Sequence, residues 1–125
     1  MNKLQDSIGK WGDETFGHSG NPIGSSQGIY HHMDKEFSEL AEAIDEAIVQ
    51  SANEKKPFGK CDKDHIAEEC ADIFILMCSL AHVNGFSIRE AVGCKMAINR
   101  SREWGKPDKD GVIEHIPTAD VKEIT

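Results

Sequence analysis

The sequence predicts an all-α fold, a bundle of three to four helices, and two observations support this prediction. Apolar residues recur at steps of three and four along two long stretches, at about residues 29–51 and 64–84, as they do on one face of an α-helix. No segment shows the alternation of apolar and polar residues that a convincing strand needs. The length of 125 residues favours a single domain over residues 1–125, with a core completed by oligomerisation.

Two weaker segments precede the first long helix. Residues 2–17 could form a short helix, although their periodicity is weak. The segment from Gly17 to Gly28 is predicted to be a loop, because its glycine, serine and proline residues offer little to pack. The helix that follows, to about Ser51, has an apolar stripe formed by Met33, Phe37, Leu40, Ile44 and Ile48.

A connector containing Pro57 and Gly59 leads to the second long helix, whose start Asp64 is expected to cap. Gly85 follows this helix at the position where a left-handed residue often ends one. The apolar stripe of the second helix consists of Ile66, Cys70, Ile73, Met77 and Leu80.

A third helix is expected from about Ser87 to Trp104, because Ser87 and Glu90 have the spacing of a capping box. The tail of residues 105–125 is polar and contains two prolines. It is predicted to be an extended C-terminal arm.

Charge and cysteine content narrow the class of protein. The net charge of −8 disfavours binding to a nucleic-acid polymer, which needs a basic surface. An apolar leader is absent, and the most apolar run, residues 73–83, is too short to span a bilayer, so we expect a cytoplasmic protein without a membrane partner. The cysteines lack CxxC spacing and are expected to be reduced core thiols: Cys61, Cys70, Cys78 and Cys94.

Two acidic pairs lie beside the apolar stripes of the long helices. Glu36 and Glu39 lie roughly 75° and 135° from the centre of the first stripe, on the same side. Glu69 and Asp72 lie at roughly the same two angles from the centre of the second stripe. Because the short connector makes the two helices antiparallel neighbours, the two pairs are expected to converge.

Four converging carboxylates are costly unless cations bind between them. Oxygen ligands favour Mg²⁺ or Mn²⁺, and Mg²⁺ held by a few carboxylates usually also binds substrate phosphates, which points to nucleotide chemistry. His65 lies four residues before Glu69 and could join the site, so iron or zinc stays open. The alternative is that the acidic residues form ordinary solvated helix faces.

The apolar stripe of the third helix turns cationic toward its end. Ile88, Ala91 and Val92 begin the stripe, and Lys95, Asn99 and Arg102 continue it. An inward cationic stripe needs anionic partners, and phosphate oxygens would suit it. Otherwise the basic residues occupy a helix C-terminus that emerges into solvent.

The segments KEFSEL and EECADIFIL resemble the E-x-x-E…E-x-x-D signature of the all-α nucleoside triphosphate pyrophosphatases, the MazG-like superfamily. With KWGDETFG, HHMDKE, KMAINRSREWGKPDKDG and EHI, they resemble its phage-type dATP/dGTP diphosphohydrolase (MazZ-like) branch. The similarity runs from about Trp11 to His115. If the chain is phage-encoded, its expected location is the host cytoplasm.

This resemblance implies an enzyme that hydrolyses a purine (deoxy)nucleoside triphosphate, dGTP or dATP, to the monophosphate and pyrophosphate. Four carboxylates would hold two to three Mg²⁺ or Mn²⁺ ions and be catalytic: Glu36, Glu39, Glu69 and Asp72. The metals would bridge the triphosphate and activate a water that attacks the α-phosphate, with Glu39 as the candidate to take its proton. Family members form dimers or tetramers, so a homodimer or homotetramer is expected.

The resemblance also implies residues that bind the substrate. Phosphate oxygens would be bound by Lys95, Asn99 and Arg102, assisted by Lys35. The base or sugar would contact His32, Trp11, Trp104 or Phe16. The loop from Gly17 to Gly28 could close as a lid, and Asp110, Glu114 and His115 in the tail could reach a neighbouring subunit.

Two other functions stay open at this point. The chain could be a non-catalytic helical interaction module with an acidic surface, in which case each of the four carboxylates could be replaced without consequence. It could also be an iron-carboxylate bundle, which iron-dependent absorbance would reveal.

Overall fold

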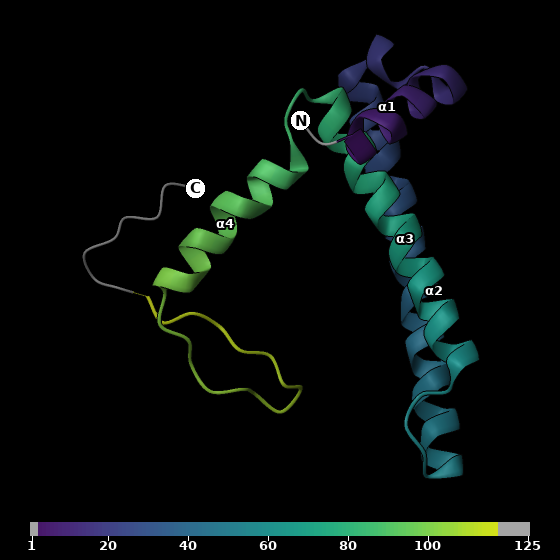
Figure 1. The fold of residues 1–125 in the computed structure, drawn as a ribbon, viewed down its shortest axis with the longest axis vertical. Coiled ribbons are helices and arrows are strands. Elements are labelled where there is room, and N and C mark those ends of the chain that lie inside the picture. Colours follow the sequence, from purple (N-terminus) through teal and green to yellow (C-terminus); the bar gives the residue numbers. More distant parts are fainter. Residues whose placement is uncertain (1–2, 118–125) are drawn as a thin grey trace. The chain divides into compact units, whose positions relative to one another are not determined.

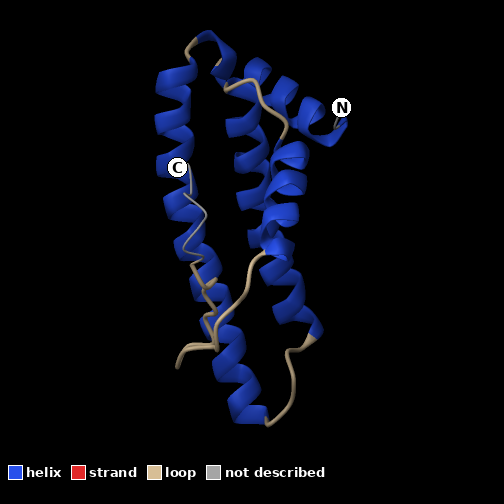
Figure 2. Cartoon of the chain, turned by 90° about the vertical axis from the view of Figure 1, so that its left-hand side faces the viewer, coloured by secondary structure: helices blue, strands red, loops and turns tan. Residues whose placement is uncertain are grey.

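The structure, a computed structural model, describes residues 3–117 and confirms the all-α prediction. The element order is α1 (Lys3–Phe16), the short 3₁₀ helix η1 (His18–Gly20), α2 (Pro22–Glu54), α3 (Lys60–Val83) and α4 (Ile88–Ser101). Figure 2 shows these helices in blue; residues 3–117 contain no strand beyond an isolated bridge between Trp104 and His115. The chain divides into two compact units, Met1–Ile88 and Arg89–Thr125, and each is described by itself.

The first unit is built on an antiparallel pair of long helices, α2 and α3 (Figure 1). The helix α2 ends at Lys55, which adopts a left-handed conformation with φ 54°. A connector of residues 56–59 then returns the chain, as predicted. The helix α1 packs against the upper part of α3, so α3 is covered by two helices there.

The core of the first unit lies between α2 and α3. Ile29, Leu76 and Val83 form its buried cluster, and Met33 and Leu80 pack against it. Farther along α2, Ala43 and Ala47 are buried against α3. Their small side chains let the two helix backbones approach closely.

The apolar stripe predicted for α2 is wrong at two positions. Phe37 and Ile48 are 48% and 51% exposed, whereas Glu36, Ala43 and Ala47 are buried. The buried face is therefore turned by roughly 75° from the predicted stripe, toward Glu36. The reason is that α2 packs on α3 through small residues, which a stripe of large apolar side chains does not reveal.

The cysteine prediction is also wrong for three of the four residues. Cys78 is buried in α3, whereas the other three cysteines are exposed, although all four are free thiols as predicted: Cys61, Cys70, Cys78 and Cys94. Cys70 lies on the side of α3 that turns away from the core, as Phe37 does on α2.

The loop predicted for Gly17 to Gly28, and with it the lid, is wrong beyond residue 21. Residues 18–20 form η1, and α2 begins at Pro22. The side chain of Asn21 caps α2 by accepting a hydrogen bond from the Gly24 backbone N–H at 3.1 Å, and proline suits the first turn of a helix. These start signals outweigh the glycine content of the segment.

The helix ends in the C-terminal half agree in part with the predictions. Asp64 does not cap α3, which begins at Lys60 after Gly59; Asp64 instead pairs with the Lys60 ammonium at 2.6 Å. Gly85 has the predicted left-handed conformation, with φ 73°. The backbone that follows α3 is linked to α1 by the buried side chain of Gln5. This side chain donates a hydrogen bond to the Phe86 carbonyl and accepts one from the Ile88 N–H, both at 2.8 Å.

The second unit consists of α4 and a loop that folds back on itself. The Gly105 N–H donates to the Glu114 carbonyl at 2.8 Å, and the Ile116 N–H donates to the Glu103 carbonyl at 2.6 Å. The described part of the tail is therefore a closed loop and not an extended arm. Residues 118–125 of the predicted arm lie outside the described residues.

Within residues 3–117 no single helix has both the length and the hydropathy needed to cross a membrane; α3 and α4 reach that threshold only when they are counted together across the break between them.

Candidate metal and nucleotide site

Three carboxylates from α2 and α3 meet in the first unit. Glu36, Glu69 and Asp72 each offer an oxygen, and these oxygens all lie within 4.8 Å of one another. The convergence predicted from the two acidic pairs is thus confirmed for three of the four members. Glu39 is outside this group, but it lies close enough to Glu36 for its carboxylate to raise the pKa of Glu36.

The electrostatics of this cluster favour a cation. Burial raises the pKa of Glu36, and the neighbouring carboxylates of Glu39 and Asp72 raise it further, whereas His32 opposes them. The side chains of Glu36 and Glu69 are only 11% and 13% exposed. In each of them Oε2 is buried and has no hydrogen-bond partner.

A divalent cation fits this donor set. A buried carboxylate oxygen without a partner is costly, and a cation between the two helices would provide the missing partner for both Oε2 atoms. Carboxylate oxygens are the ligands that Mg²⁺ and Mn²⁺ prefer. No histidine nitrogen belongs to the ligand group found among the described residues, which favours these hard cations over iron or zinc.

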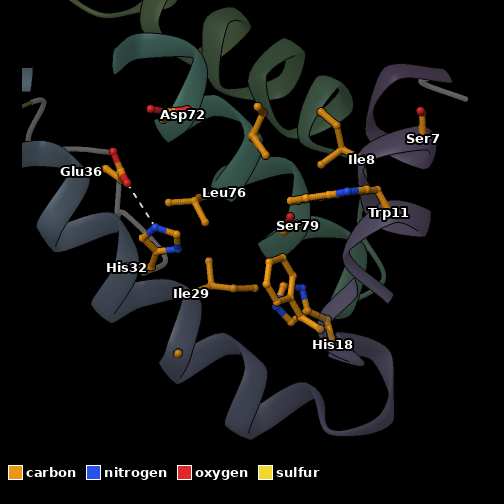
Figure 3. A pocket seen from close by; sticks show the side chains of 13 residues that line it. Ser7, Ile8, Trp11, His18, Ile29, His32, Glu36, Asp72, Leu76 and Ser79 are labelled. Carbon is orange, nitrogen blue, oxygen red and sulfur yellow. Dashed lines mark hydrogen bonds and ion pairs between the residues drawn. The ribbon is translucent and has the colours of Figure 1, made fainter. Parts of the chain in front are cut away.

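Glu36, which is buried, and Glu69, which is largely buried, each have a histidine one helical turn before them. His32 Nε2 lies 3.1 Å from Glu36 Oε1, the contact dashed in Figure 3. His65 Nε2 lies 3.5 Å from Glu69 Oε1. His65, considered above as a metal ligand, therefore faces the glutamate and stays outside the ligand group.

The carboxylates lie at one end of a pocket of about 600 Å³ (Figure 3). Glu36 and Asp72 line this end, and Ile29 and Leu76 form an apolar middle. The far end is aromatic and is formed by Trp11, Phe16 and His18. This volume and the combination of apolar walls with a few polar groups are typical of a small-molecule site.

Comparison with known proteins places this arrangement in a family. Residues 25–103 match the model of the MazG nucleotide pyrophosphohydrolase domain. The chain belongs to this family. The match includes all four carboxylates, nearly all of α2 and the whole of α3 and α4, whereas α1 and η1 lie before it.

A curated sequence and a solved structure, both from cyanophage S-2L, are similar to this MazG domain. A dATP/dGTP diphosphohydrolase of cyanophage S-2L is 42% identical over 59 residues, which are 47% of this chain and 55% of the relative, so the chain matches about half of that relative's length. The solved structure of the cyanophage S-2L MazG-like pyrophosphohydrolase, bound to dGDP and three catalytic Mn²⁺ ions per active site, has a TM-score of 0.52 and 29% sequence identity. That alignment covers 94% of this chain and 93% of the S-2L chain.

The aromatic end of the pocket in this MazG domain depends on close packing of α1. A Cβ atom at Gly9 would lie 2.3 Å from the His82 ring, and one at Gly12 would lie 2.9 Å from His18 Nδ1. Only glycine permits this approach. Trp11 and Phe16 meet edge to face at 5.3 Å, and Phe16 stacks on His18 at 5.1 Å.

Asp13 ties α1 to both η1 and α3. Its carboxylate accepts hydrogen bonds from the Ser19 N–H and hydroxyl, at 3.0 and 2.5 Å, and contacts His82 Nε2 at 2.8 Å. The hydrogen bonds from Ser19 and His82 lower the pKa of Asp13. In the family-like segment KWGDETFG, Trp11 and Phe16 thus line the pocket. Gly12 and Asp13 of the same segment hold α1 in place.

The structure brings some of the other predicted site residues to this pocket. Trp11, Phe16 and His32 line it, which is consistent with the contacts predicted for them. Lys35 is exposed on α2 and does not line the pocket. The sequence analysis missed His18, whose only signal is its place beside Gly17 in a segment that was taken for a loop.

The remaining predicted residues belong to the second unit. Lys95 is exposed on α4, and Asn99 and Arg102 are half-buried. The Trp104 indole N–H donates to the Asn99 carbonyl at 3.0 Å, and its ring lies 6.1 Å from that of His115. Asp110 and Glu114 are exposed in the closed loop. The phosphate, base and subunit contacts of these residues stay predictions.

Proposed function

We propose that this MazG domain hydrolyses a purine deoxynucleoside triphosphate, dGTP or dATP, to the monophosphate and pyrophosphate. The observation that carries this proposal is the pocket, which has two members of the carboxylate cluster, Glu36 and Asp72, at one end and an aromatic wall at the other. The family membership and the activity named for the S-2L relative support it.

Glu36, Glu69 and Asp72, with Glu39 beside them, would hold Mg²⁺ or Mn²⁺ ions. The S-2L structure carries three Mn²⁺ ions, and two to three are proposed here. When bound, such ions neutralise the carboxylates and the triphosphate and lower the pKa of water. The two buried Oε2 atoms are the ligand atoms that this role would use first.

The reaction proposed is attack of water on the α-phosphorus. A bond forms between the water oxygen and the α-phosphorus, the bond from that phosphorus to the α–β bridging oxygen breaks, and pyrophosphate leaves with the bridging oxygen. Glu39 is our candidate to accept the proton of the water, because it lies beside Glu36 but outside the group of three carboxylates.

Substrate binding follows from the shape of the pocket. Trp11 and Phe16 offer faces on which a purine can stack, and base–aromatic stacking contributes about 1–3 kcal/mol per base. The phosphate contacts of Lys35, Lys95, Asn99 and Arg102, and the base contact of Trp104, rest on the sequence alone. We also propose, from the sequence alone, that the chain assembles as a homodimer or homotetramer and lies in the cytoplasm.

The experiment that tests this proposal is a nucleotide panel run in oxygen-18 water. Each deoxy- and ribonucleoside triphosphate is incubated with the full chain and Mg²⁺ or Mn²⁺, and the products are resolved by anion exchange and mass spectrometry. We expect a purine deoxynucleoside monophosphate that carries the oxygen-18 label, with unlabelled pyrophosphate.

Label in the pyrophosphate would show attack on the β-phosphorus and overturn the proposed mechanism. Hydrolysis of pyrimidine nucleotides alone would overturn the substrate class. No turnover of any nucleotide by folded, metal-loaded protein would favour a non-catalytic interaction module.

A further inference from the structure

The two buried glutamates share a feature that the proposed reaction does not use. His32 precedes Glu36 by four residues on α2, and His65 precedes Glu69 by four residues on α3. On a helix this spacing places both side chains on one face, one turn apart. The same arrangement thus occurs on both helices that build the metal site.

In both pairs the ring nitrogen Nε2 lies near one carboxylate oxygen, Oε1. The histidine side chains are 55% and 49% exposed, while those of their glutamates are only 11% and 13% exposed. The ring nitrogen contacts Oε1 in each case, at 3.1 Å for Glu36 and 3.5 Å for Glu69. The other oxygen, Oε2, is buried without a hydrogen-bond partner in both glutamates.

Ordinary surface pairs at this spacing do not have this asymmetry. An exposed pair contributes little to stability, and both of its members face water. Here Oε1 of Glu36 lies within hydrogen-bonding distance of His32, Oε1 of Glu69 lies at ion-pair distance from His65, and Oε2 of both glutamates is buried without a hydrogen-bond partner. Asp72, the exposed member of the group, has Glu68 and not a histidine at the matching position.

We propose that His32 and His65 are a matched pair of positioning residues that hold Glu36 and Glu69 with Oε2 directed toward the divalent-cation site. This inference rests on the proposed function, because it requires that a cation bind there. It gives His32 a role different from the base contact predicted for it from the sequence. Hydrogen-bonding partners of metal ligands typically change metal affinity by about 10–100-fold.

The test is the affinity of the full chain for Mn²⁺ without nucleotide, measured by electron paramagnetic resonance of the free ion. We expect His32→Ala and His65→Ala each to weaken Mn²⁺ binding by about 10-fold or more. The amide nitrogen of glutamine reaches about as far as histidine Nε2, so His32→Gln and His65→Gln should recover most of the affinity. The matched control is His31→Ala, an exposed histidine next to His32.

The outcomes separate this inference from the proposed function. If both alanine variants bind Mn²⁺ as the wild type does, the histidines are plain surface residues and the inference is wrong. If the glutamine variants are as weak as the alanine variants, the imidazoles act as ligands and not as positioning residues. If the wild type itself does not bind Mn²⁺, the metal site and the proposed function fail together.

Folding is checked by circular dichroism and thermal unfolding of the metal-free variants. We expect these to be unchanged, because both rings are half exposed. In turnover assays, the Mn²⁺ concentration that gives half-maximal rate should rise by the same factor as the dissociation constant.

Discussion

The two ends of the pocket are built in opposite ways. The carboxylate end comes from the two long helices α2 and α3. Glu69 and Asp72 lie three positions apart on α3, and Glu36 and Glu69 each lie one turn after a histidine. The aromatic end comes from α1 and η1, which are positioned by contacts to residues far along the chain, such as Gly9 against His82. The first end concentrates charge that the fold leaves unsatisfied, and the second provides a shaped apolar wall. Substitutions should therefore separate metal binding from nucleotide binding.

The largest effect is expected at the carboxylate end. Glu69→Gln should lower turnover by at least about 100-fold, because an amide is a poor ligand for a divalent cation. It should also leave the metal-free melting temperature unchanged or raised, since it removes a buried carboxylate from a repulsive group. Steady-state kinetics and thermal unfolding measure the two effects.

The control for this prediction is Glu68→Gln, which changes the exposed neighbour of Glu69. It should leave both quantities near the wild-type values. Near-wild-type turnover of Glu69→Gln would mean that Glu69 is not a required ligand.

The next effect is expected at the aromatic end. Trp11→Ala should raise KM for the nucleotide by about 10-fold or more, because it removes a stacking surface. The affinity for Mn²⁺ alone should not change, since Trp11 is not part of the carboxylate cluster. Tyr30→Ala, an exposed aromatic outside the pocket lining, serves as the control. A parallel loss of Mn²⁺ affinity in Trp11→Ala would show that the two ends are not separable.

A third effect concerns how α1 is held. Gly9→Ala would bring a methyl group to 2.3 Å from the His82 ring, so the ring or the helix must shift. We expect a loss of about 1–3 kcal/mol in the free energy of unfolding, measured with urea. Gly93→Ala, in α4 with open space around it, should instead stabilise by up to about 1 kcal/mol. Equal effects of the two substitutions would show that the contact at Gly9 is not restrictive.

The smallest effect is a pH dependence of stability that arises from Asp13, which also contacts His82. Hydrogen bonds from Ser19 and His82 lower the pKa of Asp13 below its ordinary value of 3.8. A carboxyl with a lowered pKa in the folded state adds stability above its unfolded pKa and loses it as the pH falls through the folded value. Wild-type stability should therefore fall below about pH 4 more steeply than that of Asp13→Asn, by less than about 1 kcal/mol. The melting temperature as a function of pH, with Glu14→Gln as the control, measures this difference.

The sequence predicts the carboxylate end well because its signals are local. The periodicity of α2 and α3 and the matched offsets of the acidic pairs were sufficient to expect that Glu36 would meet Glu69 and Asp72. The error lay in the predicted angular position of the buried face of α2. Ala43 and Ala47 draw the buried face toward Glu36, so Glu36 is more buried than the pattern of large apolar residues suggests.

The aromatic end was less predictable because its determinants are distant in sequence. Trp11 and Phe16 were candidates only through the family resemblance. The placement of α1 depends on pairs such as Asp13 with His82, 69 residues apart. His18 was missed because the segment around it was interpreted as a loop. Its close contact with Gly12 is recognisable only in three dimensions.

The side chain of Gln5, which spans the backbone between Phe86 and Ile88, has a consequence for the order of folding. These partners lie 81 and 83 residues farther along the chain. During synthesis, α1 therefore leaves the ribosome long before its docking surface on α3 exists. The α2–α3 pair has a connector of only a few residues and can form first, since short-range closure is fast. The aromatic end of the pocket is thus completed last. A nascent chain stalled before residue 82 would already contain all the clustered carboxylates, but not the contact that His82 makes with α1.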